Sequence, residues 1–315
     1  MWKWIRSFIV VVVVCAFAVG ASADVFGTGL NQFTLDFVPI AGDAGDLGSW
    51  PAGDDYTFTG VDRSDYRMGM FEITNNQWNK FENSLGVPVT GTPASAYDQD
   101  SYSTGTNVPT TYVSWYEAAQ FVNWLNTSTG HQAAYKFTGT QGTGDYAPDI
   151  WSPTEAAGGT NLYRHKDAMY YLPTEDEWVK AAYWNGSWLQ SWATPDNTWP
   201  VASVEANYNG AIGRPWDVGS GSEELNGTYD MMGNVYELME SPYFSDDYGA
   251  RSDRGIRGGS YNLDDYFLAS DRRDPHSPGG EYHFFGFRVA AEVPEPSTLG
   301  LLSLGALMLL RRRRS

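Results

Sequence analysis

The chain concentrates side chains that can bind a ligand in one stretch, residues 257–275, with the sequence RGGSYNLDDYFLASDRRDP. Carboxylate and guanidinium groups hold polar ligands through charge-assisted hydrogen bonds, so the stretch has the chemistry of a cleft, of a former active site or of an ordinary salt-bridged loop. Arg273 could bind a ligand carboxylate, with a structural salt bridge as the alternative. The candidate cleft residues are Tyr261, Asp264, Asp265, Arg272, Arg273 and His276.

Histidines near this stretch offer a second chemistry, metal binding. His276 and His283 lie close behind it and could hold iron or zinc together with Asp271 or Asp274. Their spacing matches no metal motif that we can name, and the intervening Gly279–Gly280 pair makes the connection flexible. We therefore predict no catalytic residue in this chain.

The single cysteine, Cys15, lies in the apolar stretch FIVVVVVCAFAV near the N-terminus. Lys3 and Arg6 precede this stretch and the small residues ASA end it, the pattern of a secretory signal peptide over residues 1–23. A core helix is the alternative. After removal of the signal peptide, the exported chain can form no disulfide, no thiolate metal site and no cysteine nucleophile.

The C-terminus carries a second signal. VPEPST at 293–298 is followed by twelve mostly apolar residues, which are few for a bilayer span, and by four arginines suited to the cytoplasmic side. This order resembles the PEP-CTERM sorting signal, here over residues 292–315. The resemblance implies transient membrane anchoring and removal of the tail by an exosortase-type protease; an ordinary tail anchor is the alternative.

The chain is strongly acidic. Of its 20 Lys and Arg, six lie in the two terminal signals, which leaves 14 beside 38 Asp and Glu. Phosphate binding needs a basic surface, so this balance argues against a nucleic-acid partner. It is compatible with bound cations.

The elements that must position these residues are short. Three helices are marked by capping boxes, in which a Ser or Thr is followed three residues later by Glu or Gln and then by apolar residues at helical spacing. The caps are Thr74, Ser114 and Thr174. The tryptophans that we expect to pack in the core are Trp78, Trp115, Trp124 and Trp178.

Strands dispersed among these helices predict an α+β domain with much irregular structure. We expect strands at 66–74, 169–173, 255–261 and 284–292, with Phe287–Ala291 closing the sheet, and polar loops at 86–111 and 138–161. The predicted organisation is a signal peptide over 1–23, an N-terminal extension over 24–59, a domain over 60–291 and the sorting tail over 292–315.

The order of motifs along the domain resembles the formylglycine-generating enzyme family, also called the sulfatase-modifying factor family. The resemblance spans about residues 60–291, and it implies a loop-rich fold related to the C-type lectin fold. The motifs are MGMFEITNNQWNKFEN, VSWYEAAQFVNWLN, YYLPTEDEWVKAAYWNG, GTYDMMGNVYELME, RGGSY and GFRVA.

The resemblance fails at the reactive residues. Enzymes of this family oxidise a sulfatase cysteine with two active-site cysteines that hold copper, and the matching positions here are near Leu263 and Leu268. Cuprous ion needs thiolate or thioether ligands, so we expect no bound copper.

The family also implies structural calcium. Its ligands, at offsets 0, 3, 5 and 7, correspond to Asp230, Gly233, Val235 and Glu237, whose oxygens would suit Ca²⁺. An ordinary Asp-to-Gly turn entering a strand is the alternative. A second, weaker site would start at Asn207 and Tyr208, with no clear carboxylate to complete it.

Three functions follow from these observations. The first is an exported, non-catalytic binding module of the cell surface or extracellular matrix, with polysaccharide or an envelope protein as its partner. The second is a formylglycine-generating-type oxidoreductase, and the third is a structural envelope protein. The absent cysteines favour the first and third over the second.

Overall fold

The structure is a computed structural model that describes residues 21–44, 65–89 and 103–294. Most of the predicted signal peptide (1–23), nearly all of the sorting tail (292–315) and the middle of the predicted polar loop 86–111 lie outside these residues. None of the helices within them combines the length and the hydropathy that a membrane crossing requires.

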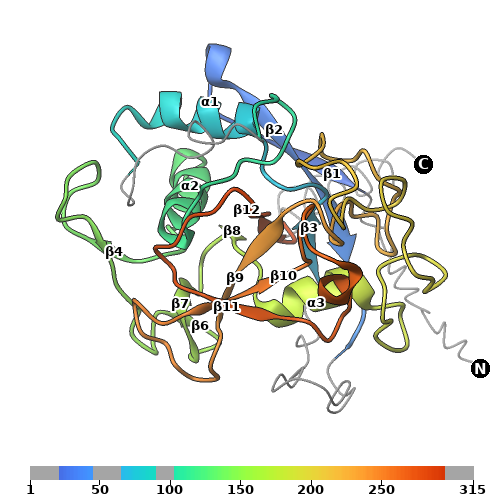
Figure 1. Cartoon of the computed structure of the whole chain (residues 1–315). Helices are drawn as coiled ribbons and strands as arrows, with labels where there is room; N and C mark the ends of the chain where they lie inside the picture. Colours follow the sequence, from blue (N-terminus) through green and yellow to red (C-terminus); the bar gives the residue numbers. More distant parts are fainter. Residues whose placement is uncertain (1–20, 45–64, 90–102, 295–315) are drawn as a thin grey trace, which may run out of the picture.

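Helices frame two main sheets, and α1 and α2 lie together on the side away from α3 (Figure 1). The α-helices are α1 (Asn75–Leu85), α2 (Trp115–Ser128) and α3 (Glu175–Tyr183), and the short 3-10 helices include η1 (Gly29–Asn31) and η3 (Asp265–Leu268). The five-stranded sheet has the order β1 (Ser22–Phe26), β2 (Phe33–Ile40), β3 (Tyr66–Gly69), β13 (Ala290–Glu292), β8 (Tyr170–Tyr171). The four-stranded sheet has the order β11 (Asp274–His276), β10 (Arg254–Arg257), β9 (Tyr236–Pro242), β12 (Phe285–Gly286). The small two-stranded sheets pair β4 (Phe137–Thr138) with β5 (Ala147–Pro148) and β6 (Ala156–Ala157) with β7 (Asn161–His165).

The three predicted capping boxes are confirmed. Thr74, Ser114 and Thr174 each accept a hydrogen bond from the backbone N–H three residues on, and the Gln or Glu there accepts one back from the cap. This exchange satisfies two otherwise unpaired N–H groups at each helix start, which explains why local sequence is enough to place these helices.

The predicted strands are shorter in the structure than in the sequence pattern. The segment expected as one strand over 284–292 forms β12 in one sheet and β13 in the other, because β12 pairs with β9 and β13 pairs with β3 and β8. Phe287–Ala291 was expected to close the sheet. In the structure, β13 lies inside the five-stranded sheet, between β3 and β8. This segment connects the two sheets.

The predicted N-terminal extension and the predicted domain share one sheet. β1 and β2 precede residue 60, yet β2 pairs with β3 along four residues. Asp24, the predicted first residue of the exported protein, lies 2.8 Å from Arg67 and accepts a hydrogen bond from the Tyr170 hydroxyl. The structural domain therefore begins well before residue 60.

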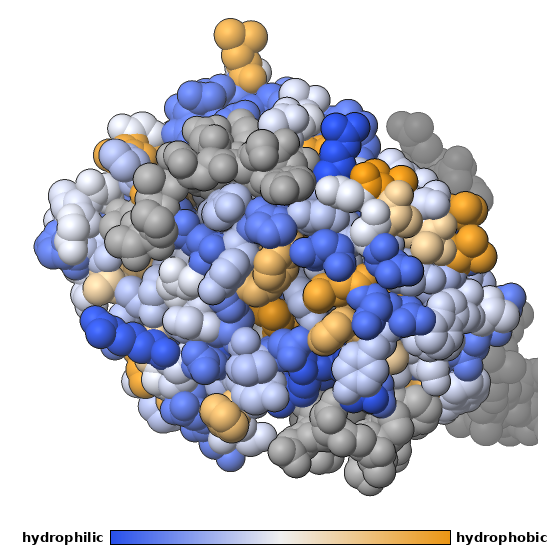
Figure 2. Space-filling view, viewed as in Figure 1, coloured by the Kyte–Doolittle hydropathy of each residue, from blue (hydrophilic) through white to orange (hydrophobic). Residues whose placement is uncertain are grey.

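The aromatic residues form most of the core. Trp78, Trp115 and Trp178 are at most 2% exposed, and Trp124 stacks on Phe33 with ring centroids 5.8 Å apart. These four tryptophans pack as predicted. With most aromatic residues in the core, the face seen in Figure 2 is mostly hydrophilic and is broken by small separate apolar areas.

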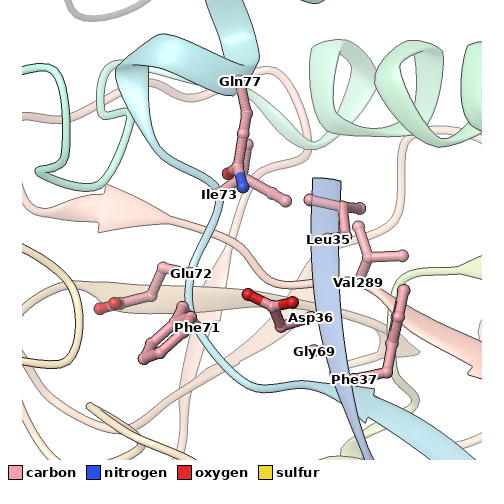
Figure 3. Close-up of a pocket in the computed structure, with 9 residues that line it drawn as sticks. All are labelled: Leu35, Asp36, Phe37, Gly69, Phe71, Glu72, Ile73, Gln77 and Val289. Carbon is pink, nitrogen blue, oxygen red and sulfur yellow. The ribbon is translucent and has the colours of Figure 1, made fainter. Parts of the chain in front are cut away.

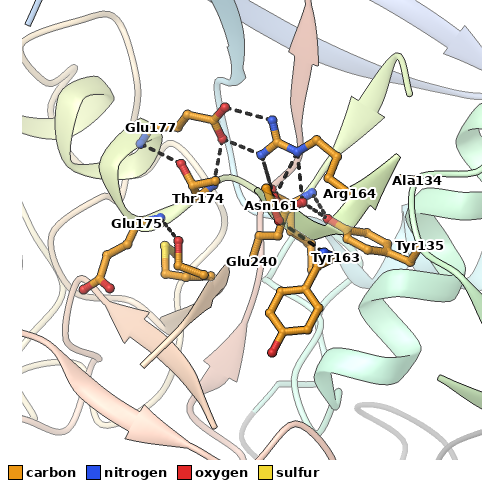
Figure 4. Close-up of polar contacts among 12 residues, drawn as sticks. Ala134, Tyr135, Asn161, Tyr163, Arg164, Thr174, Glu175, Glu177 and Glu240 are labelled. Carbon is orange, nitrogen blue, oxygen red and sulfur yellow. Dashed lines mark hydrogen bonds and ion pairs between the residues drawn. The ribbon is translucent and has the colours of Figure 1, made fainter. Parts of the chain in front are cut away.

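A buried polar network joins α3 to β7 and β9 (Figure 4). Arg164 donates to both oxygens of Glu177, which completes the capping box of α3, and to both oxygens of Glu240 in β9. The Tyr135 hydroxyl also donates to Glu240. Two carboxylates share one arginine here, and the opposite charge keeps the pKa of Glu177 below its usual value in spite of burial.

Candidate functional site

Leu263 and Leu268, near which the family resemblance places the reactive cysteines, are packing side chains. Leu268 is fully buried in the core, and its carbonyl accepts a hydrogen bond from the Tyr183 hydroxyl at 2.8 Å. Leu263 is partly buried against the same core. An aliphatic side chain offers neither a thiolate nor a metal ligand, so these positions stabilise the fold and provide no redox group.

Arg273, a predicted cleft residue, belongs to a buried ion network. Its guanidinium makes two hydrogen bonds with Glu175, at 2.7 and 2.8 Å, and lies 4.0 Å from the Tyr243 ring. Arg257 donates to the same Glu175 carboxylate at 2.7 Å. Arg273 thus takes the structural alternative that the sequence left open, and its charge is used inside the protein.

The other predicted cleft residues do not converge on one cleft. Tyr261 is buried, with its hydroxyl 2.6 Å from His283 Nδ1. His276 packs edge-on against Phe285, and burial lowers the pKa of its imidazole. Asp264 accepts the hydrogen bond that begins η3. Asp265 and Arg272 line one pocket together.

This pocket is an open hollow of about 550 Å³ between two loops. One wall of the pocket is aromatic and was not predicted from the sequence: the ring centroids of Trp192 and Trp199 lie 4.6 Å apart, with the rings at 49°. The Arg272 guanidinium covers the Tyr266 ring at 3.9 Å. The lining residues are Ser191, Trp192, Trp199, Asp265, Tyr266, Ala269, Ser270, Asp271 and Arg272.

Asp230, the first predicted calcium ligand, already has hydrogen-bond donors on both carboxylate oxygens. Oδ1 accepts from Trp216 Nε1 and Oδ2 accepts from the Gly219 N–H, both at 2.7 Å. Burial raises the pKa of this carboxyl to about 6. The backbone of Asp230 has a positive φ of 59°, which suits the predicted turn before β9.

Glu237, the last predicted calcium ligand, is neutralised by an arginine. Both of its oxygens accept hydrogen bonds from Arg288, and Oε2 also accepts one from Trp178 Nε1 at 2.8 Å. No group of three or more His, Cys, Asp or Glu side chains suited to a metal occurs within the described ranges. These contacts occupy the carboxylate oxygens of Asp230 and Glu237. The calcium site, whose other two ligands would be the backbone carbonyls of Gly233 and Val235, stays a prediction.

Gly233 has a reason to be glycine that needs no ion. Its φ is +84°, and a Cβ there would lie 2.2 Å from the backbone oxygen of Asn207. That oxygen accepts a hydrogen bond from the Asn234 N–H at 2.8 Å. The motif thus brings two chain segments into direct backbone contact, with buried Val235 next to them.

The second predicted calcium site retains one feature of a ligand. Asn207 Oδ1 is buried and lacks a hydrogen-bond partner, while its Nδ2 donates to the Arg214 carbonyl. The Tyr208 carbonyl instead accepts from the Ala211 N–H in a turn. One free amide oxygen is far short of the several oxygens that Ca²⁺ requires.

Glu72 adds a further buried carboxyl beside Asp230. Burial, and then the neighbouring Asp230, raise the pKa of Glu72 well above its usual value. Glu72 borders a cavity of about 20 Å³, but its carboxyl points away from Leu35 and Val289 on the cavity's far side (Figure 3). That volume accommodates about one water, so this cavity is no ligand site.

Comparison with known proteins agrees with this fold. The profile of the sulfatase-modifying factor enzyme 1-like domain matches residues 37–293, and the PEP-CTERM protein-sorting motif matches residues 292–314. Hercynine oxygenase from Mycobacterium tuberculosis is 28% identical over 142 residues, which are 39% of this chain and 32% of that protein. The chain thus matches about a third of the length of this relative.

Solved structures share the architecture. Treponema denticola variable protein 1 superposes with a TM-score of 0.63 at 22% identity, covering 86% of this chain and 99% of that one. PvdO from Pseudomonas aeruginosa gives a TM-score of 0.57 at 19% identity, covering 86% and 98%. The α+β, loop-rich architecture predicted from the sequence is confirmed, and the chain belongs to the sulfatase-modifying factor enzyme 1-like family.

Proposed function

We propose that this protein is an exported, non-catalytic ligand-binding module of the cell surface or extracellular matrix. The observation that carries the proposal is the pair of leucines at the family's cysteine positions, with Leu268 fully buried. Oxidation of a substrate cysteine by the family's chemistry needs thiolates for copper, and the chain has none outside its N-terminal apolar stretch. The domain thus retains the fold and has replaced the reactive atoms.

The C-terminal sorting motif supports export to the cell envelope or surface. In the proposed route, the N-terminal segment is removed on export, the tail anchors the protein transiently, and an exosortase-type protease releases it. The exported form then keeps 36 of the 38 Asp and Glu, against 14 Lys and Arg, once the terminal signals 1–23 and 292–315 are discounted. Such a charge keeps a secreted protein soluble and away from nucleic acids and anionic membranes.

Extracellular polysaccharide is the ligand class that suits this module best. The pocket between residues 191–199 and 265–272 combines aromatic rings with polar side chains, which is the composition of a small-ligand site. A second copy or an envelope protein would be expected to meet a broad apolar patch, whereas the face drawn in Figure 2 carries small separate apolar areas.

Two measurements test the proposal. The full chain, purified in detergent, is mixed with extracellular polymer from its source organism in calcium and in chelator, and saturable binding is expected.

The same protein is incubated with a peptide carrying the sulfatase cysteine motif and copper, and mass spectrometry is expected to show no aldehyde. Aldehyde formation would restore the oxidoreductase function, and absence of binding would leave a structural envelope role.

A further inference from the structure

We propose that the pocket between residues 191–199 and 265–272 binds a neutral, hydroxyl-rich sugar ring of the extracellular polymer. This inference rests on the proposed function, because it names the site and the ligand class of the same module. It is argued from the exposed rings, the polar groups, the local charge and the rigidity of this pocket.

The first argument is the exposure of large aromatic side chains. Trp199 and Tyr266 are each 52% exposed at this pocket, although most aromatic side chains of the described residues lie in the core. Exposed rings gathered at one hollow indicate a binding surface more often than scattered ones do. Trp192 and Trp199 meet at 49°, so they form an angled wall that can cover two sides of a ring. The apolar C–H face of a sugar can pack on such a wall.

The second argument is the set of hydrogen-bonding groups around the rings. Asp265 and Asp271 offer carboxylate acceptors, Arg272 offers guanidinium donors, and Ser191 and Ser270 offer hydroxyls that do both. A sugar hydroxyl is itself both donor and acceptor, so a mixed set satisfies it. A purely apolar ligand would exclude water from polar groups such as the Asp265 carboxylate without replacing its hydrogen bonds, which costs binding free energy.

The third argument is charge, and it selects a neutral ligand. Two carboxylates and one guanidinium line this pocket, so its net charge is negative and an acidic sugar would be repelled. A cation would compete with Arg272, which already covers the Tyr266 ring and lies 3.3 Å from Asp271. A hydroxyl-rich neutral ring avoids both conflicts.

The fourth argument is that buried groups hold one side of the pocket in place. Arg257 donates to the carbonyls of Ser270, at 2.9 Å, and Arg272, at 2.7 Å. Because Glu175 fixes Arg257 from the other side, the loop that carries Arg272 is tied to the core. The Ser270 N–H in turn donates to the Ser191 carbonyl, which joins the two loops.

The aromatic side is fixed as well. Asn197 Oδ1 accepts hydrogen bonds from the N–H groups of Ser191 and Trp192 and so closes the loop beneath Trp192. Trp199 Nε1 donates to the buried Tyr208 hydroxyl at 3.3 Å, which leaves the ring face exposed. A preformed site loses little entropy when it binds a ligand.

The test compares tryptophan and tyrosine variants of the full chain in detergent. The probes are the neutral and the acidic fractions of the source organism's extracellular polysaccharide, separated by anion exchange, and binding is followed by tryptophan fluorescence. We expect the wild type to bind the neutral fraction, and Trp199→Ala and Tyr266→Ala each to weaken that binding at least about tenfold, the size of a hot-spot loss.

The matched control is Trp188→Ala. Trp188 is 43% exposed but lies outside the pocket lining, so its loss is expected to change affinity less than about twofold. Trp199→Phe keeps a ring and is expected to retain most of the affinity, and circular dichroism identifies any variant that fails to fold.

Each other outcome overturns a distinct statement. Wild-type affinity in folded Trp199→Ala and Tyr266→Ala would place the ligand elsewhere and leave the proposed function intact. Binding of the acidic fraction alone would refute the neutral ligand. Binding that survives glycosidase but not protease treatment of the polymer would identify a protein partner instead. Binding to neither fraction would overturn the proposed function together with the site.

Discussion

Arg288 closes on Glu237 in a fully buried ion pair, with Arg288 Nη2 2.6 Å from Glu237 Oε1. Arg288 lies between β12 and β13, and Glu237 lies in β9, so the pair fastens the four-stranded sheet to the segment that enters the five-stranded sheet. The same arginine donates to the Gly69 and Tyr229 carbonyls. The carboxylate that the sequence motif assigns to calcium is thus the anchor of an arginine.

Glu237→Gln is expected to lower the free energy of unfolding by about 3–5 kcal/mol, because Arg288 would remain buried without an opposite charge. Urea unfolding of the variant and the wild type measures this loss. The control is Asp149→Asn, which breaks the exposed pair with Lys136 and should cost less than about 1 kcal/mol. Equal losses of unfolding free energy in the two variants would show that the buried pair stabilises the fold no more than the exposed pair does.

Calcium is expected to leave the thermal midpoint nearly unchanged. A ligand at one hundred times its dissociation constant stabilises a protein by about 2.7 kcal/mol, so an occupied site would be easy to detect. The carboxylates of Asp230 and Glu237 are already satisfied by N–H donors and by Arg288. Melting curves in calcium and in EDTA test this expectation. A calcium-dependent rise in the thermal midpoint that Asp230→Asn removes would support the calcium site that the family implies.

Glu175→Gln is expected both to destabilise the fold, by about 3–5 kcal/mol, and to weaken ligand binding. Glu175 is the shared partner of Arg257 and Arg273, and Arg257 holds the carbonyls of the loop that carries Arg272. Losing the charge would loosen that loop without touching the pocket lining. Unfolding and binding are measured on the same preparation, and a destabilised variant with wild-type affinity would refute the link between this network and the pocket.

Local sequence was enough to predict the helices, because each capping box satisfies its own N–H groups within four residues. It was not enough to predict strand ends. The segment 284–292 looks like one continuous strand, but Arg288 turns toward Glu237 and the chain changes sheets. That change depends on partners far away in the sequence, which periodicity does not record.

In the candidate site, too, local sequence predicts some residues, whereas the roles of others depend on partners far away in the chain. The replacement of the cysteines by Leu263 and Leu268 follows directly from the motif order. The role of Arg273 depends on Glu175, 98 residues away, and the exposure of Trp199 depends on how two loops meet. Several tryptophans between residues 184 and 199 were a compositional signal, but a tryptophan at an unknown depth is more often part of the core.

Stability is expected to fall as the pH rises from about 5 to about 8, in part because of Glu281. Burial, and then the neighbouring Glu117 carboxylate, raise its pKa from the ordinary value of 4.5 to about 8. The folded protein therefore holds this proton more tightly than the unfolded chain does, and folding is favoured at low pH. Urea midpoints across this range should fall less steeply in Glu281→Gln; an unchanged slope would assign the dependence to other groups.

Gly233→Ala is expected to destabilise the protein far more than Gly186→Ala. Both glycines have positive φ, of +84° and +90°, so both substitutions carry the cost of left-handed backbone, about 1–2 kcal/mol. Gly186 has open space around its Cβ position, whereas a Cβ on Gly233 would meet the Asn207 backbone oxygen at 2.2 Å. Backbone atoms cannot move aside as the end of a side chain can. The steric cost of this close contact therefore applies to Gly233→Ala alone. Equal unfolding free energies for the two variants would mean that the Asn207 contact can relax, and the need for glycine in this motif would then call for another cause, such as an ion bound by its carbonyl.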